Sequence, residues 1–340
     1  MKRTTAKKIS AIFFSLLMLT SATGCKTATK PNPTPSQEVT SEAPVNTDDA
    51  ATSEEPAASK TPDRNTDTST KVNNIEAGIG NLKFYYNKEW TYDKEQSVES
   101  SLAFTRGETL LGAICTNEKT YQVSQEMMTK SLSVVKQATD DFELIEEMTG
   151  LDVNGATWYQ CVYKIGKGDK EQYSLQRTYG KYYRAYTLTY TGLKKDFMKY
   201  KTNAVSIFNT AVFTKDEEVG PGAELAKKEM IGELDAGDYG YLELNEDGTY
   251  YWYSDSDKNM ENYHYGTYAC DNQIKTLNIS VTQNGIYLVL FPEKYFVNGE
   301  ETDMGAYKID LAISKTTQNG ADYQAVNLSN YTVYDFTRVK

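Results

Sequence analysis

The feature that most constrains the fold is a long tract, from Lys26 to about Asn74, with almost no large apolar residue. Thr, Ser, Pro, Ala, Asp and Glu dominate it, as in the run Pro31-Asn32-Pro33-Thr34-Pro35. Such a segment cannot bury enough surface to offset the entropy of ordering its chain, so it is predicted to be disordered. A flexible chain of about 50 residues has an r.m.s. span of roughly 40 Å. A packed core is therefore expected only after this tract.

The residues before the tract have the pattern of an export signal. Lys2, Arg3, Lys7 and Lys8 form a positive start, and an apolar run follows from Ile9 to Leu19. This run is too short to span a bilayer comfortably, and small residues then lead to Cys25. The pattern predicts a secretory signal peptide over residues 1–24.

The end of this signal, Ala22-Thr23-Gly24-Cys25, resembles the lipobox of bacterial lipoproteins, with Ala22 where that family usually has Leu. The resemblance implies cleavage before Cys25 and alkylation of its thiol with a diacylglyceryl group that carries fatty acids such as palmitate. The protein would then be lipid-anchored at the extracytoplasmic face of the cell membrane, with residues 25–74 as its tether. In the alternative interpretation, Ala22-x-Gly24 is an ordinary signal-peptidase site and the protein is secreted.

Residues 75–216 are predicted to form an α+β domain, an antiparallel sheet with packed helices. One helix is expected to begin with Ser124 as its cap and to bury Met128, Leu132 and Val135. A second is expected over Leu193 to Asn209, with Phe197, Tyr200, Ala204, Ile207 and Phe208 on one face. Strand patterns cover Leu82–Tyr86, Leu102–Thr105, Leu111–Thr116, Phe142–Met148, Thr157–Ile165, Tyr173–Thr178 and Arg184–Thr191.

This domain resembles the PsbP-like fold of photosystem extrinsic subunits and of many bacterial lipoproteins. The resemblance depends on Phe84 and Trp90 near the start, on Tyr186-x-Leu188-x-Tyr190, and on a helix that ends in Ile207-Phe208. Asn87 stands where the family commonly has Pro a few residues before the Trp. The resemblance implies a non-enzymatic accessory or binding module and assigns no site residues.

Residues 223–340 are predicted to form a small all-β, barrel-like domain after a break at Val219-Gly220-Pro221-Gly222. Strand patterns recur at short intervals, and Asn245-Glu246-Asp247-Gly248 is a strong hairpin signal. Evenly spaced strands with short turns are typical of an antiparallel barrel. The run Ile286 to Phe291 is apolar on both faces, so its outer face is expected to pack on the first domain or on a partner.

The same stretch resembles the lipocalin-like domains found at the C-terminus of some bacterial lipoproteins. Three motifs carry this resemblance, Gly232-Glu233-Leu234, Asp247-Gly248-Thr249-Tyr250 and Gly266-Thr267-Tyr268. Leu234 stands where the family has Trp. The resemblance implies a barrel that can hold a ligand.

A cluster of aromatic residues is the predicted ligand-binding site. Tyr251, Trp252 and Tyr253 lie on one predicted strand, and Tyr263 and Tyr265 lie on the next. Paired strands would place alternate rings on the same face, where Tyr and Trp can stack against sugar rings or apolar ligands. The alternative is a tyrosine-rich sheet face that serves only to hold the strands together.

Other patterns predict no catalytic residue, metal site or cofactor. His264 is the sole histidine and has no nucleophile or metal ligand at a suitable spacing. The run Asp255-Ser256-Asp257-Lys258-Asn259 begins like a calcium loop but lacks the required Gly and Glu, so a polar turn is predicted. Cys115, Cys161 and Cys270 are interpreted as buried hydrophobes, with a Cys115–Cys161 disulfide left open for an exported protein.

These patterns together predict a non-catalytic extracytoplasmic lipoprotein that presents two binding or interaction domains at the cell surface. The net charge of -11 argues against nucleic acid as a partner, because phosphate binding needs a concentrated positive field. The membrane is expected as a partner through the lipid anchor, together with an envelope protein, a wall glycan or a small apolar ligand. Two alternatives are an enzyme that acts on wall glycan through a carboxylate pair, and a purely structural envelope protein.

Overall fold

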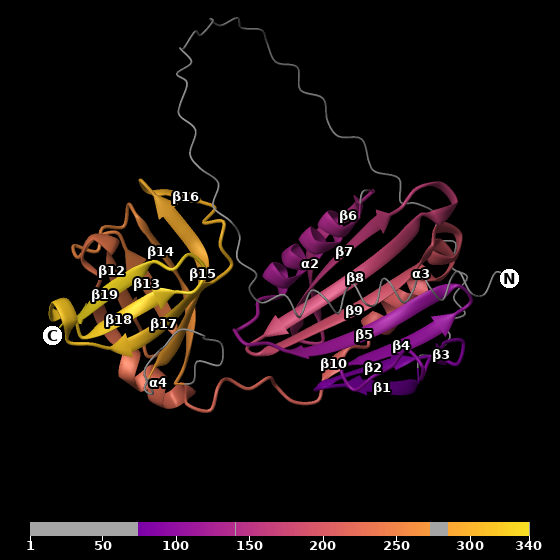
Figure 1. Ribbon diagram of the computed structural model, residues 1–340, viewed down its shortest axis with the longest axis horizontal. Helices are drawn as coiled ribbons and strands as arrows, with labels where there is room; N and C mark the ends of the chain where they lie inside the picture. Colours follow the sequence, from indigo (N-terminus) through magenta and orange to yellow (C-terminus); the bar gives the residue numbers. More distant parts are fainter. Residues whose placement is uncertain (1–73, 140, 273–284, 340) are drawn as a thin grey trace, which may run out of the picture.

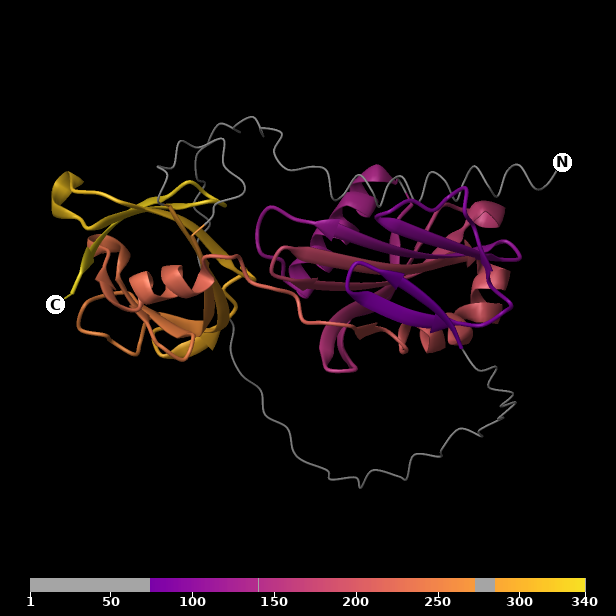
Figure 2. The ribbon, with the colours of Figure 1, turned by 90° about the horizontal axis from the view of Figure 1, so that it is seen from below.

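The computed structural model describes residues 74–139, 141–272 and 285–339. The expected signal peptide, Cys25 and nearly all of the tether lie outside the described residues. Two bodies lie side by side and are joined by residues 214–222 (Figures 1 and 2). Strands dominate both, with three α-helices among the described residues, so the protein is richer in β-structure than the expected α+β description. None of these helices is long and apolar enough to cross a membrane.

The first body is built on a seven-stranded antiparallel sheet. Its spatial order is β3 (Thr91–Tyr92), β4 (Ser101–Arg106), β5 (Thr109–Asn117), β9 (Arg184–Leu193), β8 (Gln172–Lys181), β7 (Ala156–Ile165) and β6 (Glu143–Val153). The central strands are rich in Tyr and Thr, residue types that pack well on a pleated surface. Residues 166–171 turn the chain between β7 and β8 and include a short 3-10 helix, Gly168–Lys170.

Both faces of this sheet are covered. On one face, helix α3 (Lys194–Phe208) and a small sheet share a hydrophobic core with the large sheet. The small sheet consists of β1 (Ile75–Ile79), β2 (Leu82–Tyr86) and β10 (Val212–Phe213). Phe197, Ala204, Ile207 and Phe208 of α3 are buried, which confirms the predicted apolar face of that helix. Helix α2 (Ser124–Ala138) packs on the other face with Met128 and Val135 buried.

The predicted cap of α2 is wrong. The N-cap position is Val123, and no side chain caps this end. The Ser124 hydroxyl instead accepts a hydrogen bond from the Gly180 N–H at 3.0 Å and lies 3.2 Å from the Thr157 carbonyl oxygen. The backbone of β7 and β8 therefore competes successfully for the hydroxyl group, and tertiary context overrides the local capping preference.

The three cysteines in the described residues are free and buried. Cys115 on β5 belongs to the core on the α3 face of the sheet, whereas Cys161 on β7 belongs to the core on the α2 face. Strands β9 and β8 lie between them, a separation of about 14 Å across the sheet. A disulfide needs Cα atoms within about 7 Å, so the Cys115–Cys161 bond that the sequence left open does not form.

The second body is a closed antiparallel barrel of eight strands. They are β11 (Gly232–Asp235), β12 (Tyr241–Leu244), β13 (Thr249–Tyr253), β14 (Tyr263–Asp271), β15 (Ile286–Val297), β17 (Ile309–Lys315), β18 (Tyr323–Asn327) and β19 (Val333–Arg338). Each pairs with the next, and β19 pairs with β11. β16 (Glu300–Thr302) extends β15 as a hairpin. The expected all-β barrel is thus confirmed.

Two features shape this barrel. Helix α4 (Ala223–Met230) contributes Ala226 and Met230 to the barrel core and lies across one end (Figure 1). At the β14–β15 pairing, a bulge falls between Tyr265 and Gly266. A Cβ atom on Gly266 would lie 2.0 Å from the Phe291 carbonyl oxygen, so only glycine lets the two backbones approach this closely.

The outer face of β15 packs against the first body, as the apolar run at Ile286–Phe291 predicted. Tyr287 and Val289 form one buried cluster with Tyr121 and Tyr183 of the first body. The Tyr121 N–H donates to the Tyr287 hydroxyl at 3.0 Å, and that hydroxyl donates to Asp310 Oδ1 at 2.6 Å. We call this set of contacts the domain junction.

The linker is part of the junction. The Gly220 N–H donates to the Tyr121 hydroxyl at 3.2 Å. A Cβ atom on Gly220 would lie 1.4 Å from Asp271 Oδ2, the same oxygen that accepts a hydrogen bond from the Tyr183 hydroxyl at 2.7 Å. At Gly220 the chain between the two bodies therefore runs through a space with no room for a side chain.

Candidate functional site in the barrel

The register of β13 and β14 divides the predicted aromatic cluster between two faces. Tyr251 pairs with Tyr265 and Tyr253 pairs with Tyr263, which places these four rings on the outer face of the barrel. Trp252 belongs to the barrel core and lies on the inner face, where it pairs with His264. Because successive side chains of a strand point to opposite faces, the structure gathers the rings of four predicted site residues on the outer face and places that of Trp252 on the inner face. Tyr253 and Tyr263 also border a cavity together with Trp252.

The outer rings form a stacked ladder. The ring planes of Tyr251 and Tyr253 are 8° apart with centroids 5.8 Å apart, and Tyr263 stacks on Phe296 at 4.7 Å and 4°. Tyr265 stacks on Tyr251 at 5.5 Å. In such offset stacks, the face of each ring is covered by a neighbouring ring. The ladder therefore offers mainly ring edges and hydroxyl groups, and its contacts stabilise the sheet in the manner of cross-strand aromatic pairs.

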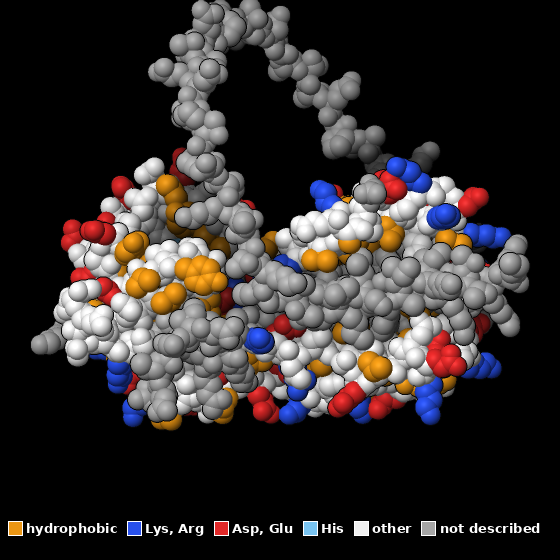
Figure 3. Space-filling model, viewed as in Figure 1, with side chains coloured by type: hydrophobic (Ala, Val, Ile, Leu, Met, Phe, Trp, Pro, Cys, Tyr) orange, Lys and Arg blue, Asp and Glu red, His pale blue; other side chains and the backbone are white. Residues whose placement is uncertain are grey.

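A cavity of about 470 Å3 opens at one end of the barrel. It lies at the end of the barrel away from α4, since its lining includes Tyr263 and His264 at the start of β14, whereas α4 packs with Tyr268 and Cys270 near the end of that strand. Hydrophobic side chains are exposed on the face of the barrel that Figure 3 shows. The lining consists of Tyr239, Trp252, Tyr253, Ser254, Asn262, Tyr263, His264, Tyr295, Met304, Ala306, Lys308, Ile309, Asn327, Ser329, Asn330 and Tyr334.

The polar groups of the cavity wall are fixed by the barrel itself. Trp252 donates its indole N–H to the Tyr239 carbonyl oxygen at 2.9 Å. His264 Nδ1 lies 2.9 Å from the hydroxyl oxygen of Tyr250, a buried residue of the barrel core. Burial lowers the pKa of His264 to about 4, because desolvation penalises the charged imidazolium. The imidazole is therefore neutral at pH 7 and adds no positive charge to the aromatic wall.

Lys308 is the one residue in the cavity lining with a charged side chain. Its ammonium group is paired with Asp310 Oδ2 at 2.7 Å, and both side chains are almost fully buried. Asp310 pairs across the sheet with Val289, whose side chain packs at the domain junction. The positive charge of Lys308 is thus balanced at the junction, which leaves the cavity suited to an uncharged ligand.

Sequence reasoning identified Trp252, Tyr253 and Tyr263 but missed the rest of the cavity wall. Tyr295, Ile309 and Tyr334 come from three strands far along the chain, and only closure of the barrel brings them together. His264 carried a usable signal, because it lies at the strand position directly opposite Trp252. Once Trp252 is placed on the inner face, its pairing with His264 alone predicts that His264 also points inward.

The polar loop at Asp255–Asn259 is a turn, as predicted. Asp255 Oδ1 accepts a hydrogen bond from the Asp257 N–H at 3.1 Å. Lys258 then reaches back and binds Glu233 at 2.7 Å and Glu243 at 2.9 Å. Hydrogen bonds from Lys258 and Tyr241 hold the pKa of Glu233 below its ordinary value, the opposite of the raised pKa that a general acid needs. This carboxylate pair is therefore an ion cluster that fixes the loop.

Among the residues that the structure describes, no group of three or more His, Cys, Asp or Glu side chains is placed to hold a metal ion. No protein family matches the sequence, and no characterised protein is similar to it in sequence.

Several solved structures resemble parts of the chain. The cyanobacterial PsbP of Synechocystis sp. PCC 6803 is 16% identical with a TM-score of 0.32, and the match covers 39% of this chain and 86% of that one. LpqN, involved in cell envelope biogenesis of Mycobacterium tuberculosis, is 12% identical with a TM-score of 0.32 and coverages of 39% and 83%. PA94 of Pseudomonas aeruginosa, a protein of unknown function described as a putative regulator, is 9% identical with a TM-score of 0.32 and coverages of 42% and 97%. Likenesses of this strength carry no argument about function.

Proposed function

We propose that this protein is a non-catalytic, lipid-anchored binding protein of the extracytoplasmic face of the cell membrane, and that its barrel holds a small uncharged ligand. The observation that carries the proposal is the cavity of about 470 Å3 in the end of the barrel away from α4. Small-molecule sites are typically concave spaces of about 300–1,000 Å3 with mostly apolar walls and few polar groups. The volume of this cavity falls in that range, and its lining combines aromatic rings with neutral polar side chains and the paired Lys308.

The chemistry of the wall favours a ligand with an apolar or ring-shaped body. Trp252, Tyr295 and Tyr334 supply aromatic surface, and His264 is neutral at pH 7. An uncharged ligand loses little hydration on entering such a site, whereas a charged one would be desolvated without a partner. Aromatic side chains also stack against sugar rings. A neutral fragment of wall glycan therefore belongs to the same class of uncharged, ring-shaped ligands.

Binding can be tested with N-phenyl-1-naphthylamine, an uncharged probe whose fluorescence rises in apolar surroundings. Wild-type protein is expected to bind it, and Ala306→Trp is expected to reduce the affinity at least about tenfold, because an exposed residue of the cavity rim is replaced by a ring that fills the opening. A fluorescence titration measures both. Thr302→Trp is the matched control, since Thr302 is exposed on β16 outside the lining. Equal affinities in all three proteins would place the probe elsewhere.

The anchor has its own test. Cells that express the full chain and are labelled with radioactive palmitate are expected to incorporate label into this protein, and Cys25→Ser is expected to abolish the incorporation, since the serine hydroxyl is not the acceptor thiol. After cell fractionation, the Cys25→Ser protein should be found in the medium or in the soluble envelope fraction instead of the membrane. Unlabelled wild-type protein would favour the alternative of a secreted chain.

A further inference from the structure

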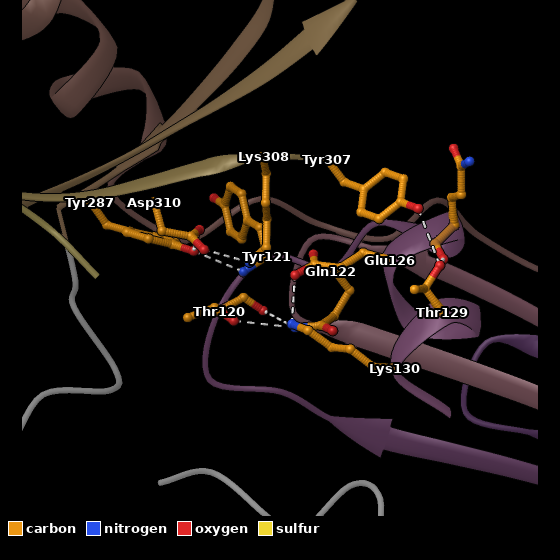
Figure 4. A network of polar contacts seen from close by, with 11 residues as sticks. Thr120, Tyr121, Gln122, Glu126, Thr129, Lys130, Tyr287, Tyr307, Lys308 and Asp310 are labelled. Carbon is orange, nitrogen blue, oxygen red and sulfur yellow. Dashed lines mark hydrogen bonds and ion pairs between the residues drawn. The ribbon is translucent and has the colours of Figure 1, made fainter. Parts of the chain in front are cut away.

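One short segment of the barrel borders both the cavity and the first body. Residues 303–308, which we call the rim segment, connect β16 to β17. Met304, Ala306 and Lys308 line the cavity. Tyr307, between two of these residues, instead reaches the first body, where its hydroxyl oxygen lies 3.2 Å from Thr129 Oγ1 on α2 (Figure 4).

The direction of the hydrogen bond between Tyr307 and Thr129 can be assigned. The Thr129 hydroxyl donates its single hydrogen to the Gln125 carbonyl oxygen at 3.0 Å. Its oxygen must therefore accept in the second contact, and the Tyr307 hydroxyl is the donor. Helix α2 thus presents a fixed acceptor to the rim segment.

The end of the rim segment is held to the first body by a second route. Lys308 is paired with Asp310, and the Asp310 carboxylate accepts a hydrogen bond from the Tyr287 hydroxyl. The same hydroxyl accepts a hydrogen bond from the Tyr121 backbone of the first body. Figure 4 shows both routes leaving the rim segment, one toward α2 and one into the domain junction.

We propose that the rim segment couples occupancy of the cavity to the docking of the first body on the barrel. This inference rests on the proposed function and adds a regulatory role for the first body, which holds the rim in the conformation that the ligand meets. A rim already fixed in its binding conformation loses less freedom when a ligand enters. By linkage, an occupied cavity must in turn strengthen the contact with α2.

The test uses the full chain and N-phenyl-1-naphthylamine as the probe. Tyr307→Phe and Thr129→Val each remove one partner of the hydrogen bond while keeping the shape of the side chain. Each is expected to weaken probe binding by about two- to tenfold, the usual range for one hydrogen bond. The double variant should bind no more weakly than the single ones, because the two residues act through one contact. Tyr92→Phe, at an exposed tyrosine on β3 of the first body and outside the cavity lining, is the control and should bind like wild type.

A reciprocal measurement separates coupling from a local effect on the rim. Saturating probe is expected to slow amide hydrogen exchange in α2 of the wild-type protein but not in Tyr307→Phe. If wild-type protein binds no probe, the proposed function fails and the coupling fails with it. If all variants bind equally, or if the probe leaves exchange in α2 unchanged, the cavity stands as a binding site and the coupling is overturned.

Discussion

Replacing Asp310 with Asn is expected to destabilise the barrel by about 3–5 kcal/mol, the usual cost of removing one partner of a buried ion pair. The side chains of Lys308 and Asp310 are only 5% and 8% exposed, and their charged atoms lie 2.7 Å apart. Asn keeps an acceptor for the Tyr287 hydroxyl but not the negative charge. The Lys308 ammonium would then be left in a low-dielectric site without compensation.

Hydrogen exchange of the peptides that contain β15 and β17 measures this loss separately for the barrel. The matched control is the double variant Lys308→Met with Asp310→Asn, which removes both charges. It is expected to recover most of the stability, since a buried ion pair is often replaceable by uncharged groups at little cost. A double variant as unstable as Asp310→Asn would show that the uncompensated charge is not the cause.

The barrel is expected to lose stability as the pH falls from about 6.5 to about 4, because of His264. Burial lowers the pKa of this imidazole to about 4 in the folded protein, from an ordinary value of 6.5. Within this window the unfolded chain binds a proton that the folded protein does not, so acidification favours unfolding. The contribution is fully present above pH 6.5 and lost by pH 4, and a shift of this size corresponds to about 3 kcal/mol.

His264→Gln isolates this contribution, because glutamine does not titrate and can still accept a hydrogen bond from Tyr250. His264 is the only histidine of the chain, and both proteins contain the same carboxyl groups. Urea unfolding at pH 7, 6, 5 and 4 should therefore show a difference between wild type and variant that shrinks or reverses on acidification. Parallel stability profiles would mean that the imidazole is not the buried neutral group inferred here.

Local patterns were sufficient for several elements of this fold. The helix over Lys194–Phe208 follows from the spacing of Phe197, Ala204 and Ile207. The barrel follows from evenly spaced strands, and the double-sided apolar run at Ile286–Phe291 indicated correctly that its outer face is covered. In each case the signal lies within a few residues, where side-chain periodicity directly reports which face is buried.

The parts that sequence reasoning did not reach depend on contacts between distant segments. Trp252 and Tyr251 are neighbours in the chain, yet Trp252 lines a cavity and Tyr251 belongs to the stacked ladder on the outer face. The cavity wall needs Tyr334, which closure of β19 on β11 brings near Trp252. Ser124 failed as a cap because Gly180 on a sheet strand supplied a competing donor. None of these partners can be derived from spacing in one sequence.

The place of Gly220 between Tyr121 and Asp271 has a consequence for biosynthesis. The junction takes its residues from segments around positions 121, 220 and 310, so it cannot close until almost the whole chain has been made. The first body emerges earlier and must wait with Tyr121 and Tyr183 open to water. Such late, non-local assembly leaves an apolar surface accessible to other chains during synthesis.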